Sequence, residues 1–151
     1  MQHFEVYLSP EHTDYSSVQL RRRYESLPDY TVIWIDTERF MACFERDHFV
    51  IPPVSEWDEA KLNHVRDTLR PDRRGLRLPE MPVAHLRLVF RTVYSGFWGF
   101  FKLFGQQVNF PVIAFSNGRH RSRYLQYAGA KTFPVEIELS NLELVRLHCG
   151  V

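Results

Sequence analysis

Basic side chains cluster in one short stretch of this sequence, and their types are suited to holding an anion. The stretch comprises Asn117, Gly118, Arg119, His120, Arg121 and Arg123. It follows an apolar run over residues 111–115 that predicts a buried strand, and a helix-compatible segment continues to Gly129. The first N–H groups of a helix have no intrahelical partners, and the helix dipole places partial positive charge there. The stretch therefore predicts a phosphate- or nucleotide-binding site.

Helical periodicity assigns different directions to these residues. At ~100° per residue, Tyr124, Leu125 and Ala128 share one face, which we expect to pack on the sheet. Arg119 and Arg123 are predicted on the opposite face, four positions apart. A purely solvent-exposed basic face is the alternative interpretation of these arginines.

Arg121 lies at the head of the apolar face, so its guanidinium is predicted to point toward the protein body. A buried guanidinium needs a partner, either an acid such as Asp36 or a bound phosphate. Gly118 is expected to adopt a positive φ, because an Asn-Gly pair between a strand and a helix commonly requires that freedom.

The elements that must position this site alternate along the chain. Strands are predicted over residues 4–8, 30–35, 82–90, 111–115 and 133–137. Helices are predicted over residues 14–27, capped by Asp14, from a cap at Thr37, and from Ser55 to the residue before Pro71.

Composition limits the class of protein. With 151 residues, 44% hydrophobic and 25% charged, the chain fits one globular domain over residues 1–151. The net charge of +1 argues against a protein that coats polyanions. Cys43 and Cys149 form no metal or disulfide pattern, so a reducing, cytoplasmic location is expected. The first residues lack the features of a signal peptide.

Aromatic residues are concentrated over residues 90–110, with interspersed glycines. Lys102 and the glycines interrupt the apolar run, which is far below the ~20 residues that span a bilayer, so no membrane insertion is expected. The segment is either a wall of the core or an exposed patch that binds a protein partner through Phe97, Trp98 and Phe101. Base stacking on exposed rings, and hence contact with nucleic acid, is a third interpretation.

Other catalytic patterns are sparse. The sequence has no phosphate-binding Gly-rich loop of the Walker type, no Cys-x-x-Cys pair and no His-Glu-x-x-His. Asp36 with Glu38, or Glu136 with Glu138, could hold a divalent ion, but two alternate acids on a strand more often face solvent. No metal site is therefore predicted.

The basic stretch resembles a known superfamily. The run 115–121, the helix ending at Gly129 and the following Phe133-Pro134-Val135 resemble the strand, Gly-x-His/Arg-Arg turn, helix and Pro-Val strand of the ParB/sulfiredoxin superfamily. Within it, the Asn-Gly-Arg-His-Arg core is similar to that of the plasmid fertility-inhibition factor family, and residues 35–49 resemble its upstream segment more faintly. The resemblance implies a small single α+β domain with a mixed sheet flanked by helices.

The same resemblance implies a function. Family members block conjugative transfer of other plasmids, so the expected partner is a protein of the conjugative transfer machinery, and ATP or another nucleotide is the expected ligand. Arg119 stands where sulfiredoxins have their nucleophilic cysteine, so sulfinic-acid reduction is not expected. A nucleotide hydrolase or nuclease of the superfamily, and an immunity or anti-defence binding protein on the same fold, are the alternative functions.

Overall fold

The computed structural model of the chain describes residues 2–71, 77–94 and 105–151. Its strands are β1 (His3–Tyr7), β2 (Ser17–Arg21), β3 (Tyr30–Asp36), β4 (Val83–Val93), β5 (Gln106–Asn117) and β6 (Thr132–Glu138). Its helices are α1 (Thr37–Phe44), α2 (Glu59–Leu69), α4 (Arg119–Tyr127) and α5 (Leu142–Cys149), with short 3-10 turns η1 (Val54–Glu56) and η2 (Leu139–Asn141).

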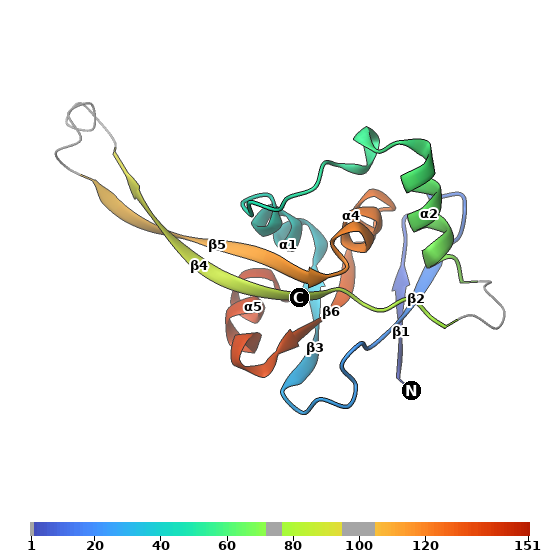
Figure 1. Cartoon of the computed structure of the whole chain (residues 1–151), viewed down its shortest axis with the longest axis horizontal. Helices are drawn as coiled ribbons and strands as arrows, with labels where there is room; N and C mark the ends of the chain where they lie inside the picture. Colours follow the sequence, from blue (N-terminus) through green and yellow to red (C-terminus); the bar gives the residue numbers. More distant parts are fainter. Residues whose placement is uncertain (1, 72–76, 95–104) are drawn as a thin grey trace.

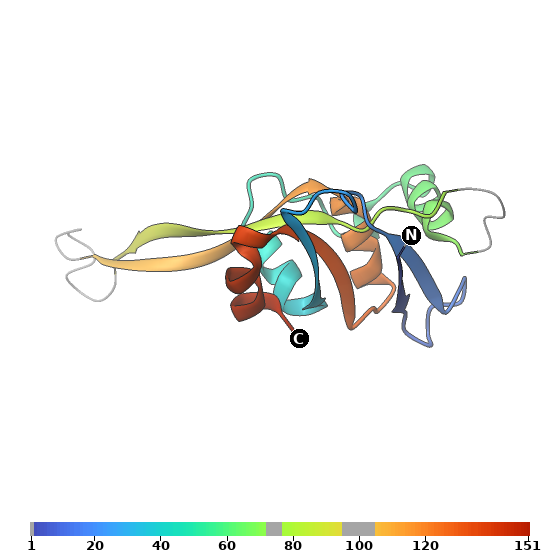
Figure 2. The ribbon, with the colours of Figure 1, turned by 90° about the horizontal axis from the view of Figure 1, so that it is seen from below.

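The larger sheet is mixed, in the order β3-β6-β4-β5. The pairs β3–β6 and β4–β5 are antiparallel, and β4 meets β6 in parallel at Val83 and Glu136. Helices α1, α4 and α5 lie on the same side of the β4–β5 hairpin (Figures 1 and 2). The expected α+β fold, with a mixed sheet flanked by helices, is therefore confirmed.

Aromatic side chains join the helices to the sheet. The Phe40 ring meets Phe133 of β6 edge to face at 5.8 Å between ring centroids, and Phe44 meets Phe115 of β5 at 4.8 Å. Such edge-to-face pairs add to the area that the rings bury. Cys43 is buried as part of the core, and its Sγ lies 3.9 Å from that of Cys149.

The helix predicted over residues 14–27 is wrong, because this segment contains strand β2. Val18 and Leu20 are buried and Gln19 between them is exposed, which is the two-residue period of a strand. Pairing with β1 along its whole length stabilises the strand over the local helical preference. Asp14 consequently caps no helix.

Two predicted helix starts are displaced by a few residues. The Asp36 carboxylate, not Thr37, caps α1 by accepting a hydrogen bond from the Arg39 N–H at 2.9 Å. Asp58 caps α2 in the same way, and Ser55 lies in η1. Both helices thus have an aspartate, a preferred residue, at the N-cap position. The conformation of the chain before each helix determines which residue takes that position.

Glu136 was expected to face solvent, and this expectation is wrong. Its side chain is fully buried, where it accepts hydrogen bonds from Arg22 Nε at 2.9 Å and from the N–H groups of Arg23 and Tyr24. One cation and two amides compensate for the loss of water around this carboxylate. Glu138, on the same strand, is exposed as predicted.

The hairpin of β4 and β5 is longer than the predicted strands and extends away from the body of the molecule (Figure 1). Helix α5 was not predicted. Arg39 fixes its end by donating to the carbonyls of Leu147 and Gly150. Within the described residues, no helix is both long enough and apolar enough to cross a bilayer.

Candidate anion-binding site

The turn between β5 and α4 has the geometry that the sequence predicts. Gly118 lies at φ 86° and ψ 11°, in the left-handed region, so the expected positive φ is confirmed. A Cβ at this position would meet the Pro82 Cα at 2.7 Å, which leaves no room for a side chain. The glycine therefore sets the direction of α4 and exposes the first N–H groups of that helix.

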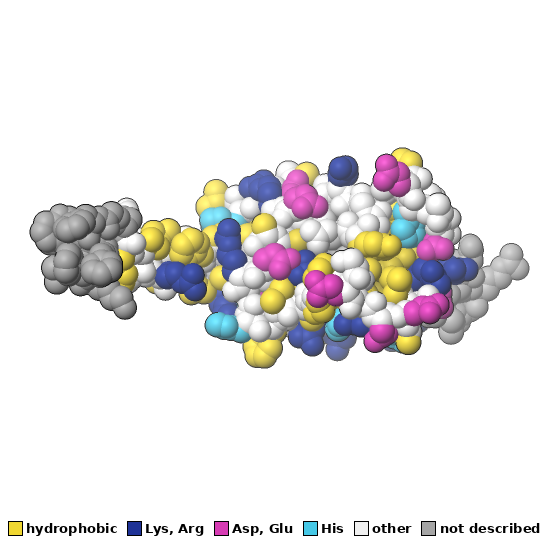
Figure 3. All heavy atoms as spheres, turned by 90° about the horizontal axis from the view of Figure 1, so that it is seen from above, with side chains coloured by type: hydrophobic (Ala, Val, Ile, Leu, Met, Phe, Trp, Pro, Cys, Tyr) yellow, Lys and Arg dark blue, Asp and Glu magenta, His cyan; other side chains and the backbone are white. Residues whose placement is uncertain are grey.

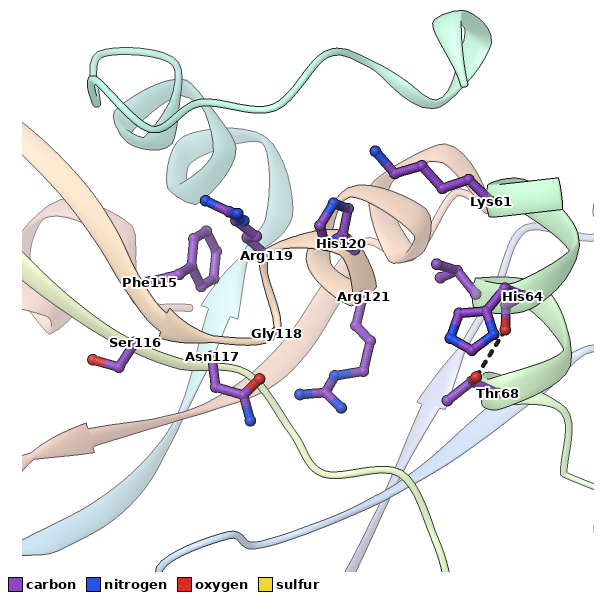
Figure 4. Close-up of a pocket in the computed structure, with 11 residues that line it drawn as sticks. Lys61, His64, Thr68, Phe115, Ser116, Asn117, Gly118, Arg119, His120 and Arg121 are labelled. Carbon is purple, nitrogen blue, oxygen red and sulfur yellow. Dashed lines mark hydrogen bonds between the residues drawn. The ribbon is translucent and has the colours of Figure 1, made fainter. Parts of the chain in front are cut away.

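A cavity of about 620 Å³ opens at this turn (Figure 4). One wall is formed by residues 115–121, and the other by Lys61, His64, Val65 and Thr68 of α2. The cavity thus contains five of the six predicted ligand-binding residues: Asn117, Gly118, Arg119, His120 and Arg121. None of its described lining residues carries a carboxylate.

Arg121 points inward, as predicted, and its guanidinium lies between Asn117 and the side chains of α2 in Figure 4. Its Nε and Nη2 atoms are buried and have no hydrogen-bond partner in the described structure. Burial lowers the pKa of Arg121, and the charge of Glu80 opposes this effect. A buried donor without a partner is costly, and an anion in the cavity would supply the missing acceptors.

Glu80 is the acid whose charge acts on the Arg121 guanidinium. The carboxylate oxygens of Glu80 already accept hydrogen bonds from other residues. Arg21 donates to Oε1 at 2.5 Å, and Arg23 and Asn117 donate to Oε2 at 2.7 Å and 3.3 Å. Asp36, named above as an example of an acidic partner, is instead the N-cap of α1. Of the two alternatives for Arg121, pairing with Asp36 is therefore excluded, and two of its nitrogens have no partner among the described residues.

His120 lines the same cavity, with its ring 5.7 Å from that of Trp57 between centroids. Burial is the main cause that lowers the pKa of His120, and the charges of Lys61 and Arg119 lower it further. The lowered pKa favours the neutral imidazole, which has one N–H donor, and protonation in acid adds the second.

Arg123 is placed differently from the prediction. It is buried rather than on an open face, forms an ion pair with Glu45 and donates from Nη2 to the Ile51 carbonyl at 2.9 Å. The loop after α1 packs on this side of α4, which covers the face that periodicity left open. Arg123 does not line the cavity and supports the fold instead.

The α2 wall is the part of the site that sequence reasoning missed. Lys61, His64 and Thr68 recur at three- and four-residue spacing, which places them on one helical face. That pattern is visible in the sequence, but the element that the face meets is not. Among the described residues, no three His, Cys, Asp or Glu side chains are grouped as a metal site would need. Phe97, Trp98 and Phe101 lie outside the described residues.

The fold and the site define a small α+β protein with a basic cavity at a strand–glycine–helix turn. The family model of the plasmid fertility inhibition factor matches residues 32–150, and the chain belongs to this family. No curated protein matches the chain. The match of the family model confirms the resemblance to this family, whereas the wider ParB/sulfiredoxin assignment stays a prediction.

A solved structure has the same fold. It is the gold(I) cyanide derivative of an oncogenic suppression activity protein, described as a plasmid fertility inhibition factor. The TM-score is 0.67 at 12% identity, and the match covers 99% of this chain and 69% of that chain. At this identity the likeness establishes the shared fold.

Proposed function

We propose that this fertility inhibition factor acts in the cytoplasm by binding a protein of the conjugative transfer machinery, and that its cavity holds a phosphate group. Family membership supports the inhibitory role. The phosphate belongs to a nucleotide such as ATP, since 620 Å³ exceeds what an inorganic anion fills.

One observation carries the ligand part of this proposal. Arg121 has two buried nitrogens without partners beside the N-terminus of α4, and Gly118 leaves that helix end uncovered. A phosphate there would accept from the guanidinium and from the free N–H groups, and it would be attracted by the helix dipole. Lys61 and Arg119 add cationic charge at the rim.

Calorimetric titration with ATP and with sulfate tests the cavity. Arg121→Ala is expected to weaken binding of both about tenfold or more, the effect of losing charge-assisted hydrogen bonds in a desolvated site. Arg146→Ala is the matched control, because Arg146 lies on α5 outside the cavity and, in the part of the chain that the structure describes, its side chain pairs with Glu143. Equal affinities of the wild type and Arg121→Ala would refute the anion site.

The second candidate function is nucleotide or nucleic-acid hydrolysis. His120 favours it, because an imidazole of lowered pKa beside an anion site is suited to accept a proton from water. Purified protein would then hydrolyse ATP or DNA, and both Arg121→Ala and His120→Asn would abolish the activity. Binding of ATP without turnover, in the presence and absence of magnesium, would instead favour the binding protein.

A further inference from the structure

The outer half of the β4–β5 hairpin, residues 88–93 and 106–111, is a two-stranded ribbon that we call the arm. All residues of β4 from Leu88 to Val93 are exposed to solvent, and Phe90 is 66% exposed. An isolated two-stranded ribbon is marginally stable in water, and exposed apolar strands favour further pairing. An exposed ribbon of this kind is therefore a candidate for pairing with another strand.

The direction of the β4 backbone groups follows from one pair of hydrogen bonds. The Leu86 N–H donates to Asn141 Oδ1 at 2.6 Å, and the Leu86 carbonyl accepts from Asn141 Nδ2 at 2.8 Å. In an antiparallel ladder both groups of a residue point the same way, and this direction alternates along the strand. The backbone groups of Leu88, Phe90 and Thr92 consequently point away from β5.

These outward groups have no partner among the described residues. The side-chain amide of Asn141 pairs with Leu86 as a neighbouring strand would, and this protection ends there. Beyond it, no described group donates to or accepts from the outward-facing backbone of Leu88, Phe90 and Thr92. Three alternate residues thus leave six strand-pairing groups open along one edge.

The opposite edge of the hairpin is protected at its inner end. Pro111 of β5 has no N–H to offer, and its carbonyl accepts from Arg46 Nη1 at 3.0 Å. Proline and a covering arginine are the devices by which proteins prevent unwanted edge pairing. Both act at Pro111, opposite Leu88, so the β5 edge is closed at the inner end of the arm, whereas the β4 edge offers an unbroken row of outward groups at Leu88, Phe90 and Thr92.

The charged residues of the hairpin indicate which kind of strand would pair with the β4 edge. The chain has 18 acidic residues, yet none between Glu80 and Glu136, so neither strand of the hairpin carries a carboxylate. On the face shown in Figure 3, the described part of the arm carries hydrophobic and basic side chains without acidic ones. Arg91 is exposed, whereas Arg87 nearer the body is paired with Asp47 at 3.3 Å. An acidic strand would complement Arg91.

We propose that the β4 edge binds an extended segment of a partner protein, which adds a strand to the sheet and alternates apolar with acidic residues. A lipid surface fits less well, because open strand edges are not tolerated in hydrocarbon. Pairing of two β4 edges from two copies would bring basic strands together without an acid between them. The proposal gives a surface to the protein contact of the proposed function, and it does not depend on the anion cavity.

Amide hydrogen exchange on the full chain tests the edge directly. In the free protein, the amides of Val89, Arg91 and Val93 should be protected by β5, while those of Leu88, Phe90 and Thr92 should exchange rapidly. A soluble heptapeptide that alternates valine with glutamate is the probe. It should slow exchange of the three outward amides about tenfold or more, whereas the valine–lysine counterpart should not.

Phe90→Pro removes the central outward N–H while leaving the β4–β5 ladder intact, and it should weaken peptide binding about tenfold. Phe90→Thr is the matched control, because it removes the ring but keeps the N–H. Protection of Val89 and Arg91 verifies that each variant is folded.

Three results would overturn the proposal. They are equal binding of Phe90→Pro and Phe90→Thr, protection of the three amides by anionic phospholipid vesicles but not by the acidic peptide, and their protection by self-association at rising protein concentration. None of these measurements involves plasmid transfer. If the β4 edge does not bind the peptide, fertility inhibition through another surface of the protein is therefore not refuted.

Discussion

Arg121 and Arg123 stand two positions apart on α4 in opposite electrostatic settings. Arg123 is buried with Glu45 and the Ile51 carbonyl as partners, while two nitrogens of Arg121 are buried without any. A binding site that keeps an unsatisfied cation loses folding stability in exchange for affinity. The two arginines should therefore respond oppositely to the same substitution.

Arg121→Met is expected to raise the free energy of unfolding by about 1 kcal/mol, because it removes two buried guanidinium nitrogens that have no hydrogen-bond partner among the described residues. Arg123→Met should lower it by about 2 kcal/mol, because the Ile51 carbonyl is left without a donor. Urea denaturation in buffer free of phosphate and sulfate measures both. A loss of stability in Arg121→Met would show that its guanidinium has partners in solution.

His120 makes the site depend on pH. Because burial, Lys61 and Arg119 lower the pKa of His120 in the folded protein, the unfolded chain binds the proton more tightly. Folding stability without ligand should thus fall as the pH drops below about 6.5, and sulfate affinity should rise as the imidazolium forms. Titrations between about pH 7.5 and pH 5.5 measure this, and His120→Asn should flatten both curves.

At the scale of the elements, Asn141 closes the β4 edge where β6 ends. It replaces a neighbouring strand with one side-chain amide, which both accepts from and donates to Leu86. Helix α5 begins directly after it, so one residue couples the end of η2 to the base of the hairpin.

Asn141→Ala is expected to lower the free energy of unfolding by about 1–3 kcal/mol, since it leaves a backbone N–H and a carbonyl unpaired. Asn141→Asp keeps the acceptor for the Leu86 N–H and loses the donor to its carbonyl, so a smaller loss is expected at pH 7. Thermal denaturation compares the two variants. Equal losses would indicate that packing, rather than the two hydrogen bonds, accounts for the effect of Asn141.

Over the whole molecule, the two proposed binding sites lie in different places. The cavity lies between α2 and α4, whereas the hairpin extends away from the body (Figure 1). A protein that inhibits by contact should tolerate damage at the cavity better than damage at its contact surface. The sequence places its densest aromatic segment, which includes Trp98, between β4 and β5.

A conjugation assay compares the two parts. Trp98→Ala is expected to abolish transfer inhibition, because truncating a tryptophan at an interface typically costs ~2 kcal/mol or more, while Arg121→Ala should retain it. The melting temperature is the control, since replacing a tryptophan of the core would lower the melting temperature by several degrees. The reverse ranking of the two variants would identify an enzyme and refute inhibition by contact.

The strand–Gly118–helix turn and the inward direction of Arg121 could be predicted from the sequence, because both depend on local geometry. A left-handed glycine and a 3.6-residue period are properties of a few neighbouring residues. The strands β3 and β6 were predictable for the same reason, since their apolar and β-branched runs are continuous.

Only the tertiary structure decided which groups are paired. Strand β2 forms because β1 lies beside it, Glu136 is buried because Arg22 and two amides surround it, and Arg123 is covered by the loop after α1. The α2 wall of the cavity and the open β4 edge likewise depend on contacts between residues far apart in the chain. A sequence pattern fixes the face on which a side chain lies, but the partner of that face is set by long-range packing.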